Sequence, residues 1–181
     1  DNDVIMTGDD NDNVLTTDGG NDELRGGDGN DILKSGAGDD FVYGEAGDDI
    51  IIQNGSGTQF YDGGEGVDTY VLKLEKFSLP DDFIVEVNLM TGFSGVHLNH
   101  DHPLNDKVIN MENIKLNGDV NSFMTGNDGD NIITSLGGDD SIYAGGGNDE
   151  IKTEKGNDII YAGGGNDYIR SGKGYDIITS G

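Results

Sequence analysis

The 181-residue chain has no cysteine, no tryptophan, only two prolines and few basic residues. The lack of cysteine excludes disulfides and zinc–thiolate sites. Ten Lys and Arg oppose 36 Asp and Glu, which gives a formal net charge of −26. Nucleic acid and anionic membrane surfaces are therefore unfavourable partners. No apolar run is long enough for a membrane span.

Apolar residues are also scarce, at 33% of the chain, so we expect no large side-chain core. High net charge with low hydrophobicity is typical of a disordered chain. The 32 glycines, together with abundant Asp and Asn, favour turns and disfavour helices. Disorder is nevertheless the weaker interpretation, because the aliphatic residues recur at a fixed interval.

The interval is nine residues, with an acid followed two residues later by an aliphatic side chain. In the second half the acids, each with an aliphatic residue two positions on, are Asp140, Asp149, Asp158, Asp167 and Asp176. In the first half they are Asp22, Asp31, Asp40 and Asp49, followed by Leu24, Leu33, Val42 and Ile51. We extend the pattern to Asp3 with Ile5, Asp12 with Val14, Thr58 with Phe60, Asp68 with Tyr70, Ser122 with Met124, and Asn131 with Ile133. This alignment requires one inserted residue near Thr16.

Residues 26–34 spell Gly-Gly-x-Gly-x-Asp-x-U-x in full, where U is a large apolar residue. The chain resembles the RTX (repeat-in-toxin) family over about residues 1–71 and 117–181. The resemblance implies an all-β fold, a right-handed parallel β-roll stabilised by calcium. Two repeats would form one turn of the solenoid, so that strands alternate between two parallel sheets. Each U residue would then stack on the U residue eighteen positions away.

The aspartates that recur every nine residues, which we call the acid column, indicate what holds the turns together. Neighbouring turns each offer one carboxylate and backbone carbonyl oxygens, the hard oxygen ligands that Ca²⁺ prefers, so we expect several calcium ions. The predicted side-chain ligands are Asp12, Asp22, Asp31, Asp40, Asp49, Asp68, Asn131, Asp140, Asp149, Asp158, Asp167 and Asp176. The predicted carbonyl ligands include those of Gly27, Gly29, Gly36, Gly38, Gly138, Gly145, Gly147, Gly156, Gly163, Gly165, Gly172 and Gly174.

Pairing acids eighteen residues apart identifies the strongest sites. These are Asp22/Asp40, Asp31/Asp49, Asp140/Asp158, Asp149/Asp167 and Asp158/Asp176. Asn131/Asp149 should be weaker for want of one charge, and Asp40/Thr58 should be poor or empty. Asp12/Asp31 and Asp49/Asp68 each span a one-residue slip. Because the ions would cancel much of the negative charge, calcium binding and folding should be coupled.

Residues 72–116 interrupt the repeats and form a β-rich connector. We expect a strand over 83–89, a turn at 90–92, a second strand over 108–116, and a protruding loop near 93–106. The strands either continue the roll, which we favour, or form a linker between two independent rolls. His97, His100 and His102 lie in this loop. They are either a transition-metal site or simply polar loop residues.

No arrangement of nucleophile and base, phosphate loop or cofactor fingerprint is visible, so we expect no enzymatic activity. The leading hypothesis is a calcium-binding module of a larger secreted bacterial protein. The resemblance implies export by type I secretion machinery and folding on calcium outside the cell. One alternative is a module of an adhesin that binds glycan or a cell surface through exposed aromatic columns, Tyr43/Tyr61 and Tyr143/Tyr161. Another is the non-catalytic tail of a secreted RTX enzyme or toxin.

Overall fold

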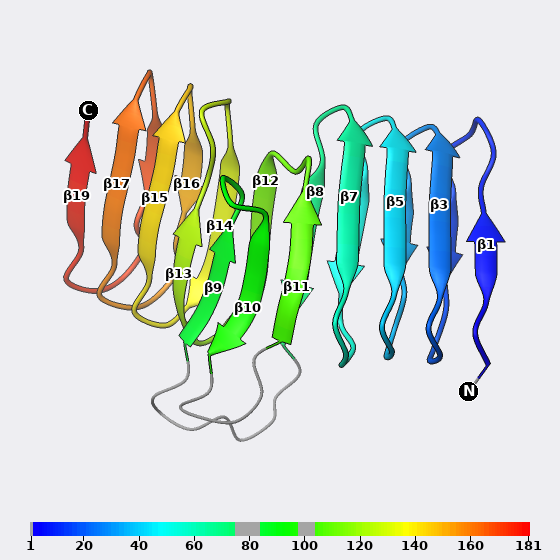
Figure 1. The fold of residues 1–181 in the computed structure, drawn as a ribbon. Helices are drawn as coiled ribbons and strands as arrows, with labels where there is room; N and C mark the ends of the chain where they lie inside the picture. Colours follow the sequence, from blue (N-terminus) through cyan, green and yellow to red (C-terminus); the bar gives the residue numbers. More distant parts are fainter. Residues whose placement is uncertain (1, 75–83, 98–103) are drawn as a thin grey trace.

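The computed structural model describes residues 2–74, 84–97 and 104–181, and all regular elements among them are β-strands. The strands form two sheets that face each other along the length of a solenoid, with the termini at opposite ends (Figure 1). The predicted all-β solenoid with parallel sheets is confirmed.

One sheet has eleven strands and the other has eight. In spatial order the eleven are β1 (Ile5–Thr7), β3 (Glu23–Asp28), β5 (Phe41–Ala46), β7 (Phe60–Glu65), β11 (Leu104–Ile109), β10 (Phe93–His97), β9 (Ile84–Asn88), β13 (Asn121–Thr125), β15 (Ser141–Gly146), β17 (Ile159–Gly164) and β19 (Ile177–Ser180). The eight are β18 (Tyr168–Arg170), β16 (Glu150–Lys152), β14 (Ile132–Gly137), β12 (Asn113–Asp119), β8 (Thr69–Lys73), β6 (Ile50–Gln53), β4 (Ile32–Lys34) and β2 (Val14–Thr16).

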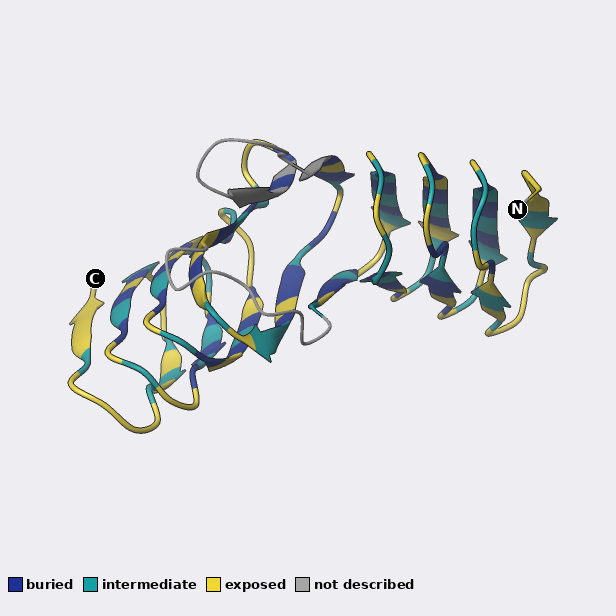
Figure 2. Cartoon of the chain, turned by 90° about the horizontal axis from the view of Figure 1, so that it is seen from below, coloured by how far each residue is buried: buried dark blue, intermediate teal, exposed yellow. Residues whose placement is uncertain are grey.

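The core is a ladder of aliphatic side chains between the sheets. Leu24 pairs with Val42, and Leu33 pairs with Ile51, in the register expected for repeats eighteen residues apart. All four are fully buried, while the residues that flank them along each strand are less buried (Figure 2). Each strand thus contributes mainly one inward side chain, because successive side chains point to opposite faces of a sheet.

The register at the N-terminal end differs from the expected one. Met6 pairs with Leu24, and Leu15 pairs with Leu33, whereas Ile5 and Val14 are exposed. The nine-residue period therefore runs through without the insertion that we expected near Thr16. The prediction was wrong because each strand carries two adjacent apolar residues, so apolarity alone does not decide which one faces inward.

A similar shift affects the repeat that we assigned to Thr58 and Phe60. Tyr61, not Phe60, is buried and pairs with Val42. Its ring lies 5.6 Å from that of Tyr70 inside the solenoid. The Tyr70 hydroxyl lies 3.1 Å from the hydroxyl of Ser94, which gives this buried polar group a partner. Burial raises the pKa of both tyrosines well above its usual value.

The connector adds strands to the eleven-stranded sheet. The chain crosses from β8 to β9, which pairs with β13; it returns through the antiparallel strand β10 to β11, which pairs with β7. The eight-stranded sheet meanwhile continues from β8 through β12 to β14 without added strands. Both sheets therefore run across the connector, as in the continuous arrangement that we favoured.

The expected strand over 83–89 and the turn at 90–92 correspond to β9 and a turn at Gly92, whose φ is +70°. Two other expectations for the connector were wrong. Residues 93–97 and 104–106 belong to strands β10 and β11 rather than to a loop, and the remaining residues of the expected loop, 98–103, lie outside the described residues. The run 108–116 is divided between β11 and β12, in different sheets, because a turn at Asn110 separates them. His100 and His102 lie outside the described residues, so the histidine metal site stays a prediction.

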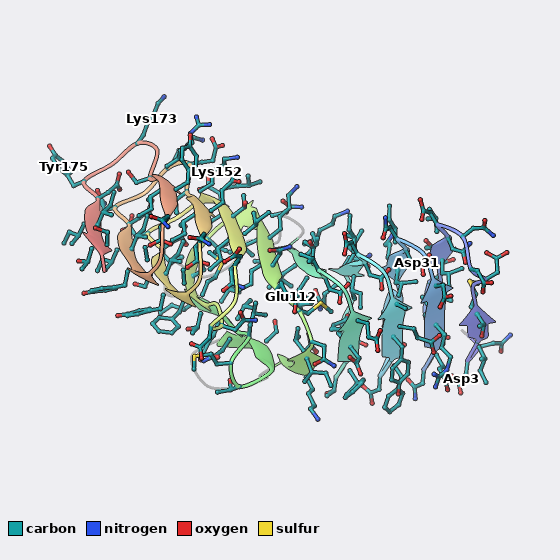
Figure 3. All side chains as sticks on the ribbon, turned by 90° about the horizontal axis from the view of Figure 1, so that it is seen from above. Asp3, Asp31, Glu112, Lys152, Lys173 and Tyr175 are labelled. Carbon is teal, nitrogen blue, oxygen red and sulfur yellow. The ribbon has the colours of Figure 1, made fainter. Side chains whose placement is uncertain are left out.

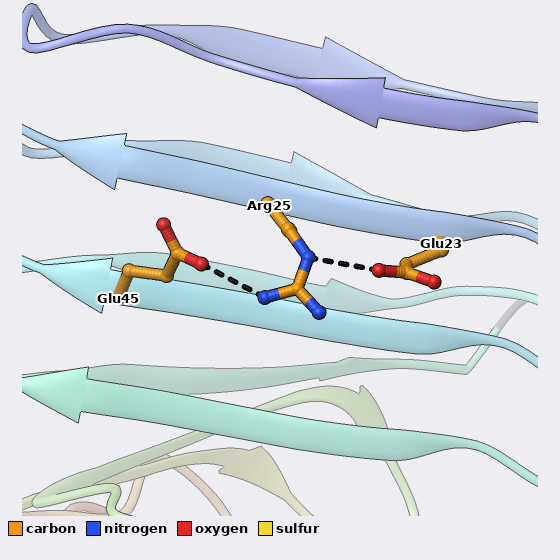
Figure 4. Close-up of polar contacts among 3 residues, drawn as sticks. All are labelled: Glu23, Arg25 and Glu45. Atoms are coloured by element: carbon orange, nitrogen blue, oxygen red, sulfur yellow. Dashed lines mark hydrogen bonds and ion pairs between the residues drawn. The ribbon is translucent and has the colours of Figure 1, made fainter.

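The outer face of the sheets carries polar contacts between strands. Arg25 on β3 donates hydrogen bonds to Glu23 at 2.8 Å and to Glu45 on β5 at 3.0 Å (Figure 4). The guanidinium also lies 4.5 Å from the centre of the Tyr43 ring. These groups are exposed, so solvent screening keeps their contribution to stability small.

Candidate metal centre

The predicted acids line the two long edges of the solenoid, where the chain turns from one sheet to the other. We call the turns that follow strands of the eleven-stranded sheet the first edge, and those that follow strands of the eight-stranded sheet the second edge. The first edge carries Asp31, Asp49, Asp68, Asn131, Asp149 and Asp167. The second edge carries Asp22, Asp40, Asp140, Asp158 and Asp176.

On each edge the carboxylates form a ladder of hydrogen bonds between successive turns. The backbone N–H of Asp31 donates to Oδ1 of Asp49 at 2.7 Å, and that of Asp49 donates to Oδ1 of Asp68 at 2.8 Å. On the second edge, Asp140 donates in the same way to Oδ1 of Asp158 at 3.0 Å. The structure thus brings together the five acid pairs that we predicted as the strongest sites, and also Asp49 and Asp68 across a one-residue slip.

The other carboxylate oxygen of most of these acids has no partner. The carboxylates whose Oδ2 atom is buried and lacks a hydrogen bond are those of Asp22, Asp31, Asp40, Asp49, Asp68, Asp140, Asp149 and Asp158. Leaving a buried acceptor unpaired is costly, and burying an uncompensated carboxylate is more so. The Oδ2 atom is unpaired at eight turns, so this arrangement is a property of the repeat. A cation beside each oxygen would offset the cost of burying it.

Backbone carbonyl oxygens surround the same positions. A Cβ atom added to Gly26 would overlap both Oδ2 of Asp31 and the carbonyl oxygen of Gly44 in the next turn. At Gly44 the equivalent overlap involves Asp49 and the carbonyl of Gly63. Carboxylate and carbonyl oxygens are the hard ligands that Ca²⁺ prefers, so the donor set fits calcium. Bound there, calcium would neutralise the carboxylates and join adjacent turns.

The glycines that we predicted to supply carbonyl ligands all adopt a positive φ. The turns stack so closely that a side chain at these positions would clash; a Cβ on Gly163, for example, would overlap the carbonyl oxygen of Gly145. The repeat therefore needs glycine both for the left-handed conformation and for the close approach of neighbouring turns.

Asp12 is not in the acid column, contrary to our prediction. Asn13 occupies that position, and its N–H donates to Oδ1 of Asp31 at 2.7 Å. Asp12 is exposed and accepts the N–H of Asn30 at 2.8 Å, in an outer ladder formed by the residues that precede the column. The error follows from the misplaced register at the N-terminal end.

The second edge is interrupted by Gln59, which takes the place that we assigned to Thr58. Its Oε1 accepts the N–H of Asp40 at 2.9 Å, as a column carboxylate would. Its Nε2 donates to the carbonyl oxygen of Gly38 at 2.8 Å, so the amide group uses a carbonyl that we predicted as a calcium ligand. An amide supplies no charge for a cation, and the expectation of a poor site beside Asp40 stays a prediction.

Two acids of the connector extend the ladders and were missed. Glu112 accepts the N–H of Asp68 through Oε2 at 2.8 Å, and Figure 3 shows it between the two blocks of repeats. Asp106, which is buried, accepts the N–H of Gln59 through Oδ1 at 3.0 Å. A signal for both was present in the sequence, since Val108 and Ile114 follow them by two residues as in the repeats.

On the first edge Asn131 occupies a position that is an aspartate in the repeats that follow it. Its Oδ1 accepts the N–H of Asn127 at 2.8 Å, and its Nδ2 donates to the carbonyl oxygen of Glu112 at 2.6 Å. The amide thus forms hydrogen bonds where the carboxylates leave an oxygen unpaired. Its role as a calcium ligand stays a prediction.

Burial dominates the electrostatics of the acid columns. It raises the pKa of Asp49 and of Asp140 to about 6, and that of Asp68 and of Asp106 to about 7. Neighbouring acids raise the pKa further at Asp49, Asp68 and Asp140, whereas hydrogen bonds lower it in part. A cation that binds these carboxylates near neutral pH therefore competes with protons.

Comparison with known families agrees with this geometry. The family model of the RTX calcium-binding nonapeptide repeat matches the chain four times, at residues 16–51, 118–151, 125–158 and 146–178, which together cover more than half of it. The chain belongs to the RTX calcium-binding repeat family. RTX repeats bind calcium, and RTX proteins are typically secreted. No curated protein gives a significant match to this RTX chain. Its described residues contain no helix long and apolar enough to cross a membrane.

The raised pKa values predict how the metal-free RTX fold depends on pH. The folded chain retains protons on these carboxyls between the unfolded value of 3.8 and the folded values of about 6 to 7. The metal-free fold should therefore be most stable at acidic pH and should lose stability as the pH rises through that range. Far-UV circular dichroism of the chelator-treated chain against pH measures this, and β content that rises toward neutral pH would contradict it.

Substitution of one inner acid should affect two neighbouring turns. Asp158 accepts the N–H of Asp140 through Oδ1 and leaves Oδ2 buried and unpaired. Asp158→Ala therefore removes the hydrogen-bond acceptor for the preceding turn and a candidate ligand for the ion that would join the following turn. We expect the calcium concentration at the midpoint of folding to rise several-fold, measured by circular dichroism. The control is Asp128→Ala, which removes an equal charge from an exposed residue. Equal shifts in the two variants would show that position in the column does not matter.

Proposed function

We propose that the chain is a calcium-dependent folding module of a larger secreted RTX protein, exported in an unfolded state by type I secretion machinery. The observation that carries this proposal is the row of buried, unpaired Oδ2 atoms on successive turns. Without a counterion, these carboxylates and the net charge of −26 oppose compaction. In a low-calcium cytosol the chain would remain expanded and suited to export. Higher calcium outside the cell would fold it.

We propose a non-catalytic role for these residues. The column acids are repeated along two edges and accept hydrogen bonds from the backbone of neighbouring turns. This arrangement suits cation binding between turns. An activity of the parent protein would then reside elsewhere, as in the tail of a secreted enzyme or toxin.

The test is a calcium titration of the chelator-treated chain near neutral pH, followed by far-UV circular dichroism and size-exclusion chromatography. We expect a cooperative change from an expanded coil to compact β-structure at about 10⁻⁴–10⁻³ M calcium, the range of extracellular calcium modules. Magnesium is the control, because it retains its water ligands and requires a tighter octahedral site. A compact β-fold present before calcium is added would remove the physical basis for export in an unfolded state.

A second candidate function is ligand binding through aromatic side chains on the outer face of the eleven-stranded sheet. Phe123, Tyr143 and Tyr161 lie on adjacent strands and are each more than a third exposed. The Tyr143 and Tyr161 rings stack with centres 4.7 Å apart at 13°, and Phe123 lies 5.3 Å from Tyr143. Exposed aromatic faces suit contact with sugar rings or with another protein. The second column differs from the one that we expected, because Tyr61 is buried and the ring beside Tyr43 is that of Phe60, with centres 5.7 Å apart.

This second function predicts glycan binding that depends on the stacked pair. On a glycan array, the calcium-loaded chain should bind specific glycans, and the Tyr143→Ala/Tyr161→Ala double variant should lose that binding. Phe41→Ala, which removes an exposed aromatic ring from the other end of the same sheet, serves as the control. An array without signal, or a signal that the double variant retains, would contradict this function.

A further inference from the structure

We propose that Glu112 of the connector completes an additional calcium site with Asp68 and the carbonyl oxygen of Asn110. The site combines Asp68, the last acid of the first block of repeats, with two residues of the connector, and it would join the block to the connector by an ion. The inference rests on the proposed calcium-dependent function and deepens it.

The first support is the hydrogen-bond ladder of the first edge. Asp31 donates its N–H to Asp49, Asp49 to Asp68, and Asp68 to Glu112, at 2.7, 2.8 and 2.8 Å. Glu112 therefore occupies the next place in the column, although 44 residues separate it from Asp68. A glutamate has one more methylene group than aspartate, which lets a carboxylate reach this place from the different backbone of the connector.

The second support is the unpaired oxygen of Asp68. This side chain is fully buried, and its Oδ2 atom has no hydrogen-bond partner. A Cβ added to Gly63 would lie 2.5 Å from that oxygen and would overlap the carbonyl oxygen of Asn110. The same pair of oxygens, one from the column acid and one from the next turn, surrounds Gly26 and Gly44 in the repeats. The connector thus reproduces the donor set of a repeat turn.

The third support is the way in which the Asn110 carbonyl is held. Asn110 adopts a φ of +51°, and its Nδ2 donates to Oδ1 of Asp62 at 2.8 Å. This contact fixes the turn that presents the carbonyl. On the far side of the connector, Asn131 and Asn127 donate side-chain hydrogen bonds to the carbonyl oxygens of Glu112 and Met111, at 2.6 and 3.3 Å. An ion would therefore add to the direct hydrogen bonds between the first block and the connector turn, whereas the second block contacts that turn through the side-chain amides of Asn127 and Asn131.

Glu112→Gln in the full chain tests this site. The amide retains a hydrogen-bond acceptor for Asp68 but loses the charge. We expect isothermal titration calorimetry to show a calcium stoichiometry lower by one than in the wild type. We also expect calcium to give less protection from hydrogen exchange at the Asp68 amide and at residues 110–113. Glu112→Asp, which restores the charge, should recover part of this protection.

The control is Glu65→Gln, which removes the same charge from an exposed side chain of the Asp68 turn and should leave both readouts unchanged. A Glu112→Gln variant with wild-type stoichiometry and protection would overturn the proposal. Protection around Asp140 and Asp158 in the second block reports separately on the general function. If calcium protects those residues in every variant and Glu112→Gln changes nothing at Asp68, only the additional site is wrong. If calcium protects no residue in the wild type, the proposed function itself fails.

Discussion

Eight column aspartates each place a buried carboxylate between two turns of the solenoid, and the rest of the structure depends on neutralising it. One oxygen accepts an N–H from the preceding turn, which fixes the stacking of the turns. The other faces carbonyl oxygens and lacks a partner. The interior adds mainly one apolar side chain per strand, so little hydrophobic burial is available to offset the electrostatic cost. Neutralisation of these carboxylates, by a bound cation or by protons at acidic pH, therefore determines the stability of such a solenoid.

The connector shows how the solenoid accommodates a long insertion. The eight-stranded sheet passes through it by pairing Tyr70 with Ile114 and Ile114 with Ile133. The eleven-stranded sheet takes up the additional strands, and Val85, Val87 and Val108 extend the same core. On both edges an acid of the connector continues the hydrogen-bond ladder. The insertion therefore meets the constraints of the repeat at both edges and in the core.

Most of the fold and of the acid columns could be predicted from sequence, because a nine-residue period fixes which side chains lie in register. The prediction failed where the period was ambiguous. Ile5 and Met6 are both apolar, so either could face the interior. We took the acid Asp3 as the column residue, but Val4 occupies that position, and the predicted register was therefore displaced by one residue. At Thr58 the shift to Gln59 hid a side chain whose amide mimics a column carboxylate. Glu112 and Asp106 could have been found from the acid and the aliphatic residue two positions later. The residues that they contact, Asp68 and Gln59, lie more than forty positions away in sequence, and only the structure places Glu112 and Asp106 beside the repeats.

The most direct test of the calcium requirement is a crystal structure of the calcium-loaded chain, with anomalous diffraction to locate the ions. Anomalous peaks should lie along both edges, between successive turns and within coordination distance, about 2.3–2.6 Å, of the Oδ2 atoms that the protein leaves unpaired. The peak beside Asp40 should be weak or missing, because Gln59 replaces the next carboxylate there. A folded solenoid with waters or protein donors at these oxygens, and no anomalous peaks beside them, would show that the carboxylates are stabilised without calcium.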